Sequence, residues 1–209
     1  MQTAKVFGVI KRFEYATRLG ALALATGDVG GGKTTALRWV ASRRHPSEYQ
    51  VIWITASQGS ILEFYRQICV ELEVDTTSFS KAVLTKFIRK QILEVAQDRK
   101  KQSVLIIDEA SLLRLEVLAE LHNITQFQGD SKPILPIILA GQNNLADLLI
   151  YRTSFPLASR IVAGAIWPAS PSRTCRTTFC ITSKLQVSNR TSSLIRPASP
   201  YSRAPAASS

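Results

Sequence analysis

The sequence predicts an α/β domain in which a parallel sheet is covered by helices on both faces. Short apolar runs with the composition of buried strands occur at 21–26, 51–55, 104–107 and 134–140. Longer segments between them carry apolar residues at helical spacing. Because parallel strands must be joined by crossovers, this alternation is typical of a three-layer αβα core.

Each expected element rests on a local pattern. An N-terminal helical segment, 1–19, has apolar residues at helical spacing from Val6 to Leu19. The run 51–55 (VIWIT) is rich in β-branched and aromatic residues, and the run 134–140 carries Pro136 near its start. Further helices are expected at 34–44, 61–72, 79–96, 113–127 and 145–151.

Composition limits the class of protein. The chain has 209 residues and is 45% hydrophobic, which argues against disorder of the whole chain. No apolar run is long enough to span a membrane, and the N-terminus lacks the apolar region of a signal peptide. The three cysteines have neither a disulfide framework nor metal-site spacing. A cytoplasmic protein is therefore expected.

The net charge of +11 is unevenly distributed along the chain. Residues 1–163 carry +5, whereas residues 164–209 hold six Lys and Arg, no acid, ten serines and five of the nine prolines. This shift predicts a core at 20–163 and a basic, Ser/Pro-rich tail at 164–209, irregular or disordered. Since the tail supplies more than half of the excess, net charge alone is weak evidence for nucleic-acid binding.

A glycine-rich loop provides the strongest chemical signal. The segment 27–34 (GDVGGGKT) fits G-x-x-x-x-G-K-[ST], follows an expected strand and opens an expected helix. Glycines let the backbone wrap around phosphates, Lys33 would reach the β- and γ-phosphates, and the Thr34 hydroxyl would bind Mg²⁺. The residues expected to hold the nucleotide are Gly27, Asp28, Val29, Gly30, Gly31, Gly32, Lys33, Thr34 and Thr35.

A second motif follows at the end of an apolar strand. The segment 104–109 (VLIIDE) has the hhhhDE form of a Walker B strand. Asp108 would join Thr34 in holding Mg²⁺, and Glu109 would polarise the attacking water as general base. A solvated strand end is the alternative for this motif alone. With the glycine-rich loop, it predicts a P-loop NTPase that hydrolyses ATP.

Other polar positions have open assignments. Gln142 is the first choice and Asn143 the second for a sensor after the strand 134–140, while an Asn-rich turn capping a helix is the alternative. Arg160 and Arg152 are candidates for an arginine finger supplied to a neighbouring subunit, the alternative being ordinary surface or packing residues. The basic clusters 43–44 and 99–101 are interpreted as solvated faces, with DNA contacts as the alternative.

The motifs GDVGGGKTT, VLIIDEA, LEVLAEL and ILAGQNNL, in this order, resemble the ExeA/GspA-like AAA+ ATPases, related to TniB-type transposition helpers. The resemblance covers about residues 20–163. It implies Mg-ATP hydrolysis, homo-oligomers with nucleotide at subunit interfaces, and a partner that is either a secretion complex or a transposase–DNA complex. The absence of membrane-spanning parts favours the mobile-element type. The family usually reads Gly-Gln-Pro-Glu-Leu where this chain has 141–145 (GQNNL), which leaves the sensor open.

The family continues into a small helical lid, whereas 164–209 has no helical pattern. With permitted codons, 164–188 rereads in the adjacent frame as RSHLAGVSLQDMQDYLLHHLKIAGV, which has helical periodicity and resembles that lid. We hypothesise a one-base loss near 163–164, which the coding DNA would reveal; a genuine basic tail is the alternative. Without the lid, nucleotide binding would weaken and hydrolysis would be poor. A nucleotide-gated adaptor, a DNA-binding protein and an inactive truncated product remain alternative functions.

Overall fold

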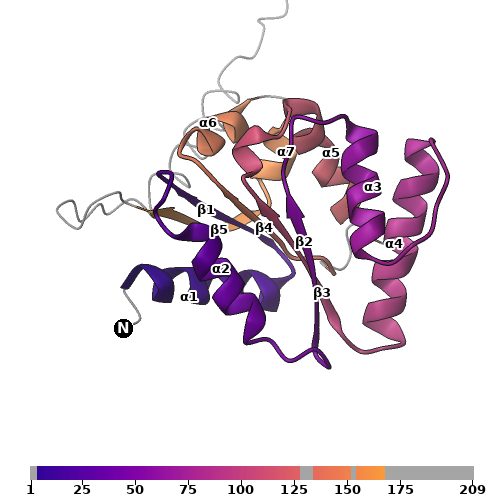
Figure 1. Cartoon of the computed structure of the whole chain (residues 1–209), viewed down its shortest axis with the longest axis horizontal. Helices are drawn as coiled ribbons and strands as arrows, with labels where there is room; N and C mark the ends of the chain where they lie inside the picture. The colour runs from indigo at the N-terminus through magenta and orange to yellow at the C-terminus, as the bar shows by residue number, and fades with distance from the viewer. Residues whose placement is uncertain (1–3, 128–133, 152–153, 168–209) are drawn as a thin grey trace, which may run out of the picture.

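The computed structural model describes residues 4–127, 134–151 and 154–167 (Figure 1). These residues form a five-stranded sheet with the order β2-β3-β4-β1-β5, in which every pairing is parallel. The strands are β1 (Leu22–Gly27), β2 (Tyr49–Thr55), β3 (Gln102–Asp108), β4 (Ile137–Gly141) and β5 (Ile161–Trp167). The predicted parallel α/β core is confirmed.

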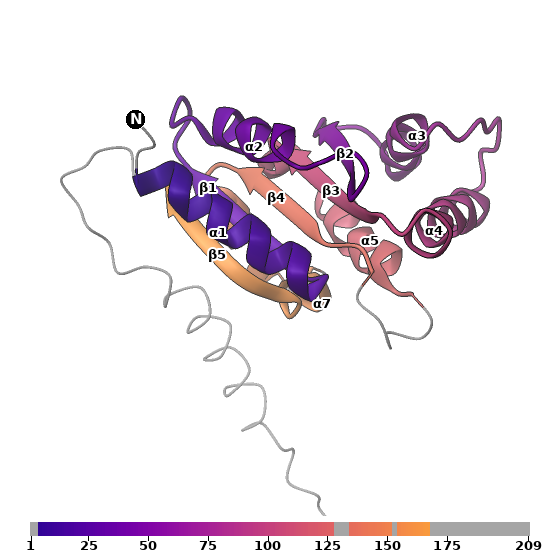
Figure 2. The same cartoon turned by 90° about the horizontal axis from the view of Figure 1, so that it is seen from below.

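Helices cover both faces of the sheet. One layer contains α1 (Ala4–Leu19) and α2 (Lys33–Ser42), which lie together on the same side in Figure 2. The opposite layer contains α3 (Ile61–Glu71), α4 (Lys81–Gln97), α5 (Leu115–Thr125), α6 (Asn144–Ile150) and α7 (Phe155–Ala158). No helix among the described residues has both the length and the apolarity needed to cross a membrane.

Side-chain alternation along each strand divides the apolar residues into two cores. On β3, Leu105 and Ile107 pack against α3, α4 and α5, whereas Val104 and Ile106 face the α1–α2 layer. Buried on both faces, the central strands read as continuous apolar runs. The edge strand β2 differs, because Val51 and Trp53 on its α2 side are only partly buried.

The strand order also defines the point at which the chain connections reverse their direction. The crossover from β1 to β2 runs in one direction along the sheet, and the crossovers from β3 to β4 and from β4 to β5 run in the other. Because parallel crossovers are right-handed, the helices of these connections cover opposite faces. The chain therefore separates at the carboxyl ends of β1 and β4, the position where open α/β sheets bind ligands.

Several boundaries differ from the sequence-based expectation. Strand β4 begins at Ile137, directly after Pro136, because a proline cannot donate the amide that a central strand requires. A 3₁₀ turn, η1 (Ala110–Leu112), precedes α5, and α5 is shorter than the helix expected at 113–127 because its capping residues Arg114 and Gln126 are extended. The helix α7 was not expected from local periodicity.

Strand β5 crosses the domain boundary expected at 163–164. Its residues 164–167 pair with 24–27 of β1, so the sheet continues four residues into the expected tail. The reason is visible in the sequence, because 164–167 (GAIW) is apolar and the run of Pro, Ser and Arg begins only at Pro168. The remaining tail, 168–209, for which disorder was predicted, lies outside the described residues.

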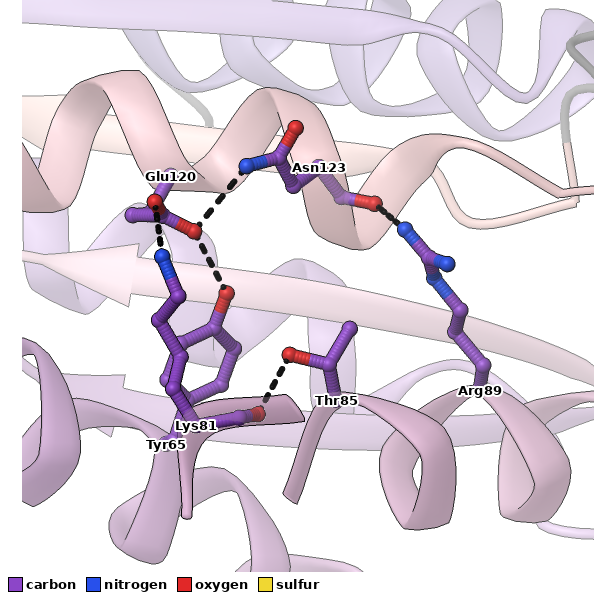
Figure 3. Close-up of polar contacts among 6 residues, drawn as sticks. All are labelled: Tyr65, Lys81, Thr85, Arg89, Glu120 and Asn123. Carbon is purple, nitrogen blue, oxygen red and sulfur yellow. Dashed lines mark hydrogen bonds and ion pairs between the residues drawn. The ribbon is translucent and has the colours of Figure 1, made fainter. Parts of the chain in front are cut away.

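A polar cluster joins α3, α4 and α5 on the face away from α1 (Figure 3). The Glu120 carboxylate accepts hydrogen bonds from Lys81 Nζ at 2.7 Å, Asn123 Nδ2 at 3.0 Å and the Tyr65 hydroxyl at 3.1 Å. The Arg89 guanidinium donates to the backbone carbonyl of Asn123. Three consecutive α-helices are thereby held together by one carboxylate.

Burial affects the titration of this cluster. Desolvation, assisted by the nearby Glu120 carboxylate, raises the pKa of Tyr65 to about 12. Burial alone would raise the pKa of Glu120, but its hydrogen bonds from Lys81, Asn123 and Tyr65 and the charge of Lys81 outweigh this, so its pKa is lowered. Stability from the Glu120 carboxylate is therefore present above its unfolded-state pKa and is lost as the pH falls through its folded-state pKa.

We expect Glu120→Gln to reduce the free energy of unfolding by about 1 kcal/mol at neutral pH, because the hydrogen bonds to a charged acceptor are weakened. The difference from wild type should shrink as the pH falls below the carboxylate range. Urea unfolding across this range measures it. The exposed Glu116→Gln on the same helix is the control. A pH-independent loss in Glu120→Gln would contradict the role of its charge.

Candidate nucleotide-binding site

The loop between β1 and α2 has the backbone that phosphate binding requires. Gly30 and Gly32 adopt left-handed conformations with φ of 75° and 84°, and Gly32 is the N-cap of α2. A Cβ built on either glycine would meet no atom within 4 Å. These residues therefore border open space at the amino end of α2, and the loop has room for an anionic group there.

Lys33 lies inside this loop. Lys33 is only 6% exposed, and its ammonium donates to the carbonyls of Gly27 at 2.9 Å and Asp28 at 2.8 Å. An ammonium has three donors, so one is left for a ligand in the loop. Thr34 is half-buried and Thr35 is exposed, both in the first turn of α2.

The acidic pair stands at the end of β3. Asp108 is 4% exposed, and its Oδ1 accepts a hydrogen bond from the Glu109 amide at 3.0 Å. Its backbone carbonyl accepts from the Ala56 amide at 2.8 Å, which anchors the strand end beside β2. Glu109 is half-buried and has a φ of 53°. This left-handed conformation is strained for a non-glycine residue, a feature that clusters at functional sites.

The two sensor candidates have different surroundings. Asn143 Nδ2 donates to the Asp28 carboxylate at 2.9 Å, which joins the segment after β4 to the glycine-rich loop. Gln142 is half-buried, and its backbone amide donates to Ser111 Oγ at 3.3 Å. The structure thus brings the second choice, Asn143, to the phosphate loop, and it ties the backbone of the first choice to η1.

Arg160 lies at the amino end of the strands, opposite the end that carries the glycine-rich loop. Its carbonyl accepts from the amide of Leu22, the first residue of β1, and its Nη1 donates to Thr125 Oγ1 at 3.0 Å. Strand β1 has six residues, so about 17–20 Å of strand separate this point from the loop after Gly27. Arg160 therefore cannot reach the loop of its own chain. Arg152 lies outside the described residues.

Gly141 and Ser111 contribute to the site although sequence reasoning missed them. A Cβ on Gly141 would lie 2.9 Å from the Ser111 amide nitrogen and 3.0 Å from Leu145 Cδ2. The absence of a side chain lets η1, which directly follows Glu109, approach the end of β4. A glycine at a strand end was the available signal, but its neighbour is thirty residues away in sequence.

A parallel sheet, a glycine-rich loop after β1 and an acidic end on the β3 strand together define a P-loop NTPase. Residues 17–149 match the family described as AAA domain, and the chain belongs to this family. The chain is therefore an AAA-type ATPase, and proteins of this class bind nucleotides.

Two relatives support this placement. General secretion pathway protein A of Aeromonas hydrophila is 30% identical over 144 residues, which cover 69% of this chain and 26% of the relative. ATP-dependent target DNA activator B of Escherichia phage Mu is 33% identical over 121 residues, covering 58% and 36%. The expected resemblance to ExeA/GspA-like and transposition-helper ATPases is confirmed. The chain spans about a quarter to a third of the length of these relatives.

A solved structure shares the fold. The ORC1 protein of Aeropyrum pernix, solved in complex with DNA, superimposes with a TM-score of 0.63 at 17% identity. The likeness covers 88% of this chain and 49% of that one. At this identity it supports the architecture of the sheet and its helices.

Glu109→Gly should retain the wild-type free energy of unfolding or raise it by up to about 1 kcal/mol, because glycine adopts the left-handed conformation without strain. Glu109→Val should lose about 1–2 kcal/mol, since a β-branched residue fits this conformation poorly. Urea unfolding measures both variants. Equal stability of the valine and glycine variants would show that the strain is absent.

Gly141→Ala should destabilise the protein by about 1–3 kcal/mol, because the new methyl group would overlap the Ser111 backbone. Gly8→Ala in α1 is the matched control. Its Cβ would meet only the flexible Arg12 guanidinium at 3.1 Å, and alanine favours a helix by up to about 1 kcal/mol. Thermal unfolding of both variants tests the close approach, and a neutral Gly141→Ala would contradict it.

Proposed function

We propose that this chain binds and hydrolyses ATP with Mg²⁺ and acts as a helper ATPase of a transposition or secretion machine. The Lys33 ammonium, held inside the loop by the Gly27 and Asp28 carbonyls, is the observation that carries the proposal. The acidic end of β3 supports it, because buried Asp108 and adjacent Glu109 end one strand of the same parallel sheet.

Each residue has a distinct role in this proposal. The backbone amides of the loop and the amino end of α2 hold the phosphates, and Lys33 contacts their β- and γ-oxygens. The Thr34 hydroxyl and the Asp108 carboxylate are the oxygen donors that Mg²⁺ prefers. Bound there, the ion would neutralise charge on the phosphates. Glu109 accepts a proton from the attacking water as general base.

Asn143 is the more suitable sensor on geometric grounds. It already contacts the loop through Asp28, so a nucleotide that moves Asp28 also changes the position of the segment after β4. Gln142 keeps a supporting role through its backbone bond to Ser111. We propose that Asn143 positions the loop. We further propose that one of the two side chains, Asn143 or Gln142, contacts the γ-phosphate.

Arg160 is suited to act only on a neighbouring subunit. It lies at the amino edge of the sheet, far from the loop of its own chain. An arginine supplied in trans requires a homo-oligomer in which this edge faces the nucleotide of the next copy. We therefore propose assembly into homo-oligomers, with Arg160 as the candidate finger.

The names of two relatives support a class of partner machine. One relative is named for the general secretion pathway and the other for the activation of target DNA. We propose a transposition or secretion partner for this chain. The aligned part covers 26% of the first relative and 36% of the second.

The end of β5 bears on the proposed loss of the lid. Trp167 pairs with Gly27, so the segment that follows residue 167 starts beside the phosphate loop. In the adjacent frame the helical lid is read from 164–188, and we propose that it would close over the nucleotide. Its replacement by an out-of-frame sequence would weaken binding and hydrolysis. A nucleotide-gated adaptor without turnover, or an inactive product, is the corresponding second candidate. Sequencing the coding DNA for the adjacent frame decides whether a base was lost.

Glu109→Gln should lower Mg-dependent ATP turnover by about 100-fold or more while a fluorescent ATP analogue still binds, because only the general base is removed. Lys33→Ala should weaken binding itself, since the phosphate-contacting ammonium is lost. Glu116→Gln on the exposed side of α5 should change neither quantity. Restoring the lid frame should raise turnover. No turnover in the restored chain would overturn the enzymatic proposal and leave the adaptor.

A further inference from the structure

The positive charge of the core gathers on one layer of the fold. Residues 1–49, which include α1 and α2, carry eight Lys and Arg against three Asp and Glu, a net +5. Residues 50–163 carry twelve of each and are neutral. Lys33 and Asp28 belong to the phosphate loop and cancel, so the excess lies on the remaining α1–α2 layer. The count along the sequence already shows this asymmetry, and the fold adds that α1 and α2 lie on the same face of the sheet.

The cations of this layer come from two helices that contact each other. Lys11 and Arg18 are exposed on α1 and lie two turns apart, about 10 Å along the axis, with the half-exposed Tyr15 between them. Arg38 is exposed on α2 and Arg43 just after it. In Figure 2, α1 and α2 lie side by side over the sheet. We call these four cations the α1–α2 basic face.

Aromatic rings hold the arginines of α2 in place. The Arg43 guanidinium lies 4.2 Å from the ring centre of Trp39, and that of Arg38 lies 5.6 Å from the ring centre of Trp53. Arg44 is also anchored, by an ion pair with Glu14 of α1 at 3.0 Å. A guanidinium is always charged, and stacking limits its rotamers, so less entropy is lost when it contacts an anion.

We propose that the α1–α2 basic face binds the phosphate backbone of double-stranded DNA. Charge complementarity selects a polyanion, because these exposed cations lie on two helices that contact each other, in a part of the chain with a net charge of +5. The inference goes beyond the proposed ATPase function and does not depend on turnover. The basic residues of 43–44, interpreted from sequence as a solvated face, become part of or adjacent to this surface.

The same features argue against other anionic partners. Single-stranded binding relies on aromatic faces open for base stacking, but the Trp39 and Trp53 rings are half-buried and each already has a guanidinium above it. A membrane-binding face needs large apolar side chains on the exposed side, where residues 8–19 of α1 offer only Tyr15 and Leu19. A duplex needs neither feature, since its backbone contacts are electrostatic.

The test compares two quadruple variants of the full chain that remove the same charge and leave the basic tail intact. One changes the basic face: Lys11→Gln, Arg18→Gln, Arg38→Gln and Arg43→Gln. The control changes exposed cations of α4 and the turn after it: Lys86→Gln, Lys90→Gln, Arg99→Gln and Lys100→Gln. The probe is a labelled DNA duplex of about 30 base pairs, followed by fluorescence anisotropy between about 50 and 200 mM salt.

The basic-face variant should bind at least about 10-fold more weakly, and its slope of log affinity against log salt should fall by about 2–4, since each lost phosphate contact removes about 0.9. The control should change affinity by less than about 3-fold. The α1 pair and the α2 pair, changed separately, should each give part of the effect, which keeps the test valid if the quadruple variant folds poorly. Circular dichroism and retained ATP-analogue binding verify folding independently of DNA.

Three results would overturn the proposal. Equal losses in the two quadruple variants would assign binding to overall charge, and unchanged affinity in the basic-face variant would assign it to the tail. If the wild-type chain does not bind the duplex, double-stranded DNA is not the ligand of this face. The same conclusion applies if the chain binds phosphatidylserine vesicles or single-stranded DNA instead. Because ATP turnover is not a readout, failure here is distinguishable from failure of the proposed ATPase.

Discussion

The burial of β1 between β4 and β5 is the constraint on which the rest of this structure depends. Every residue of β1 is buried, and the strand delivers its last residue, Gly27, directly into the glycine-rich loop. On the α1–α2 side three of the four core positions of β1 and β4 are alanines, Ala23, Ala25 and Ala140, and the fourth is Ile138, whereas Leu and Ile fill the other side. Small side chains let α1 and α2 pack closely against the sheet, so the helix that begins at Lys33 is held rigidly behind the loop.

The candidate site is assembled from three strand ends that lie next to each other only because of the strand order. Asp108 comes from β3, Asn143 follows β4 and the loop follows β1. Their alignment depends on short-range steric features, above all the missing side chain of Gly141 beside Ser111. Interactions of about 1 kcal/mol each therefore position the charged groups of the proposed site. Glu109 is held there in a strained left-handed conformation.

Local patterns predicted most of the fold correctly. The helices at 61–72 and 79–96 and the strands at 51–55 and 104–107 differ from the structure by a few residues at their ends, because amphipathic periodicity and continuous apolar runs are local properties. The strand β5 was missed for a physical reason. Its sequence, IVAGAIW, contains a glycine and adjoins a compositional change, and only pairing with β1 makes it a strand. The 3₁₀ turn after Glu109 likewise depends on its contact with β4.

The sequence by itself determined the chemical identity of the loop and of the acidic strand end, since both motifs are contiguous and their spacing follows from backbone geometry. Only the tertiary structure decided that Asn143 and not Gln142 contacts the loop, that Arg160 lies at the far edge of the sheet, and that the +5 of the core collects on the α1–α2 layer. These outcomes depend on which distant residues a crossover brings together. A right-handed crossover assigns each helix to a face, and that assignment cannot be read from the periodicity of the helix alone.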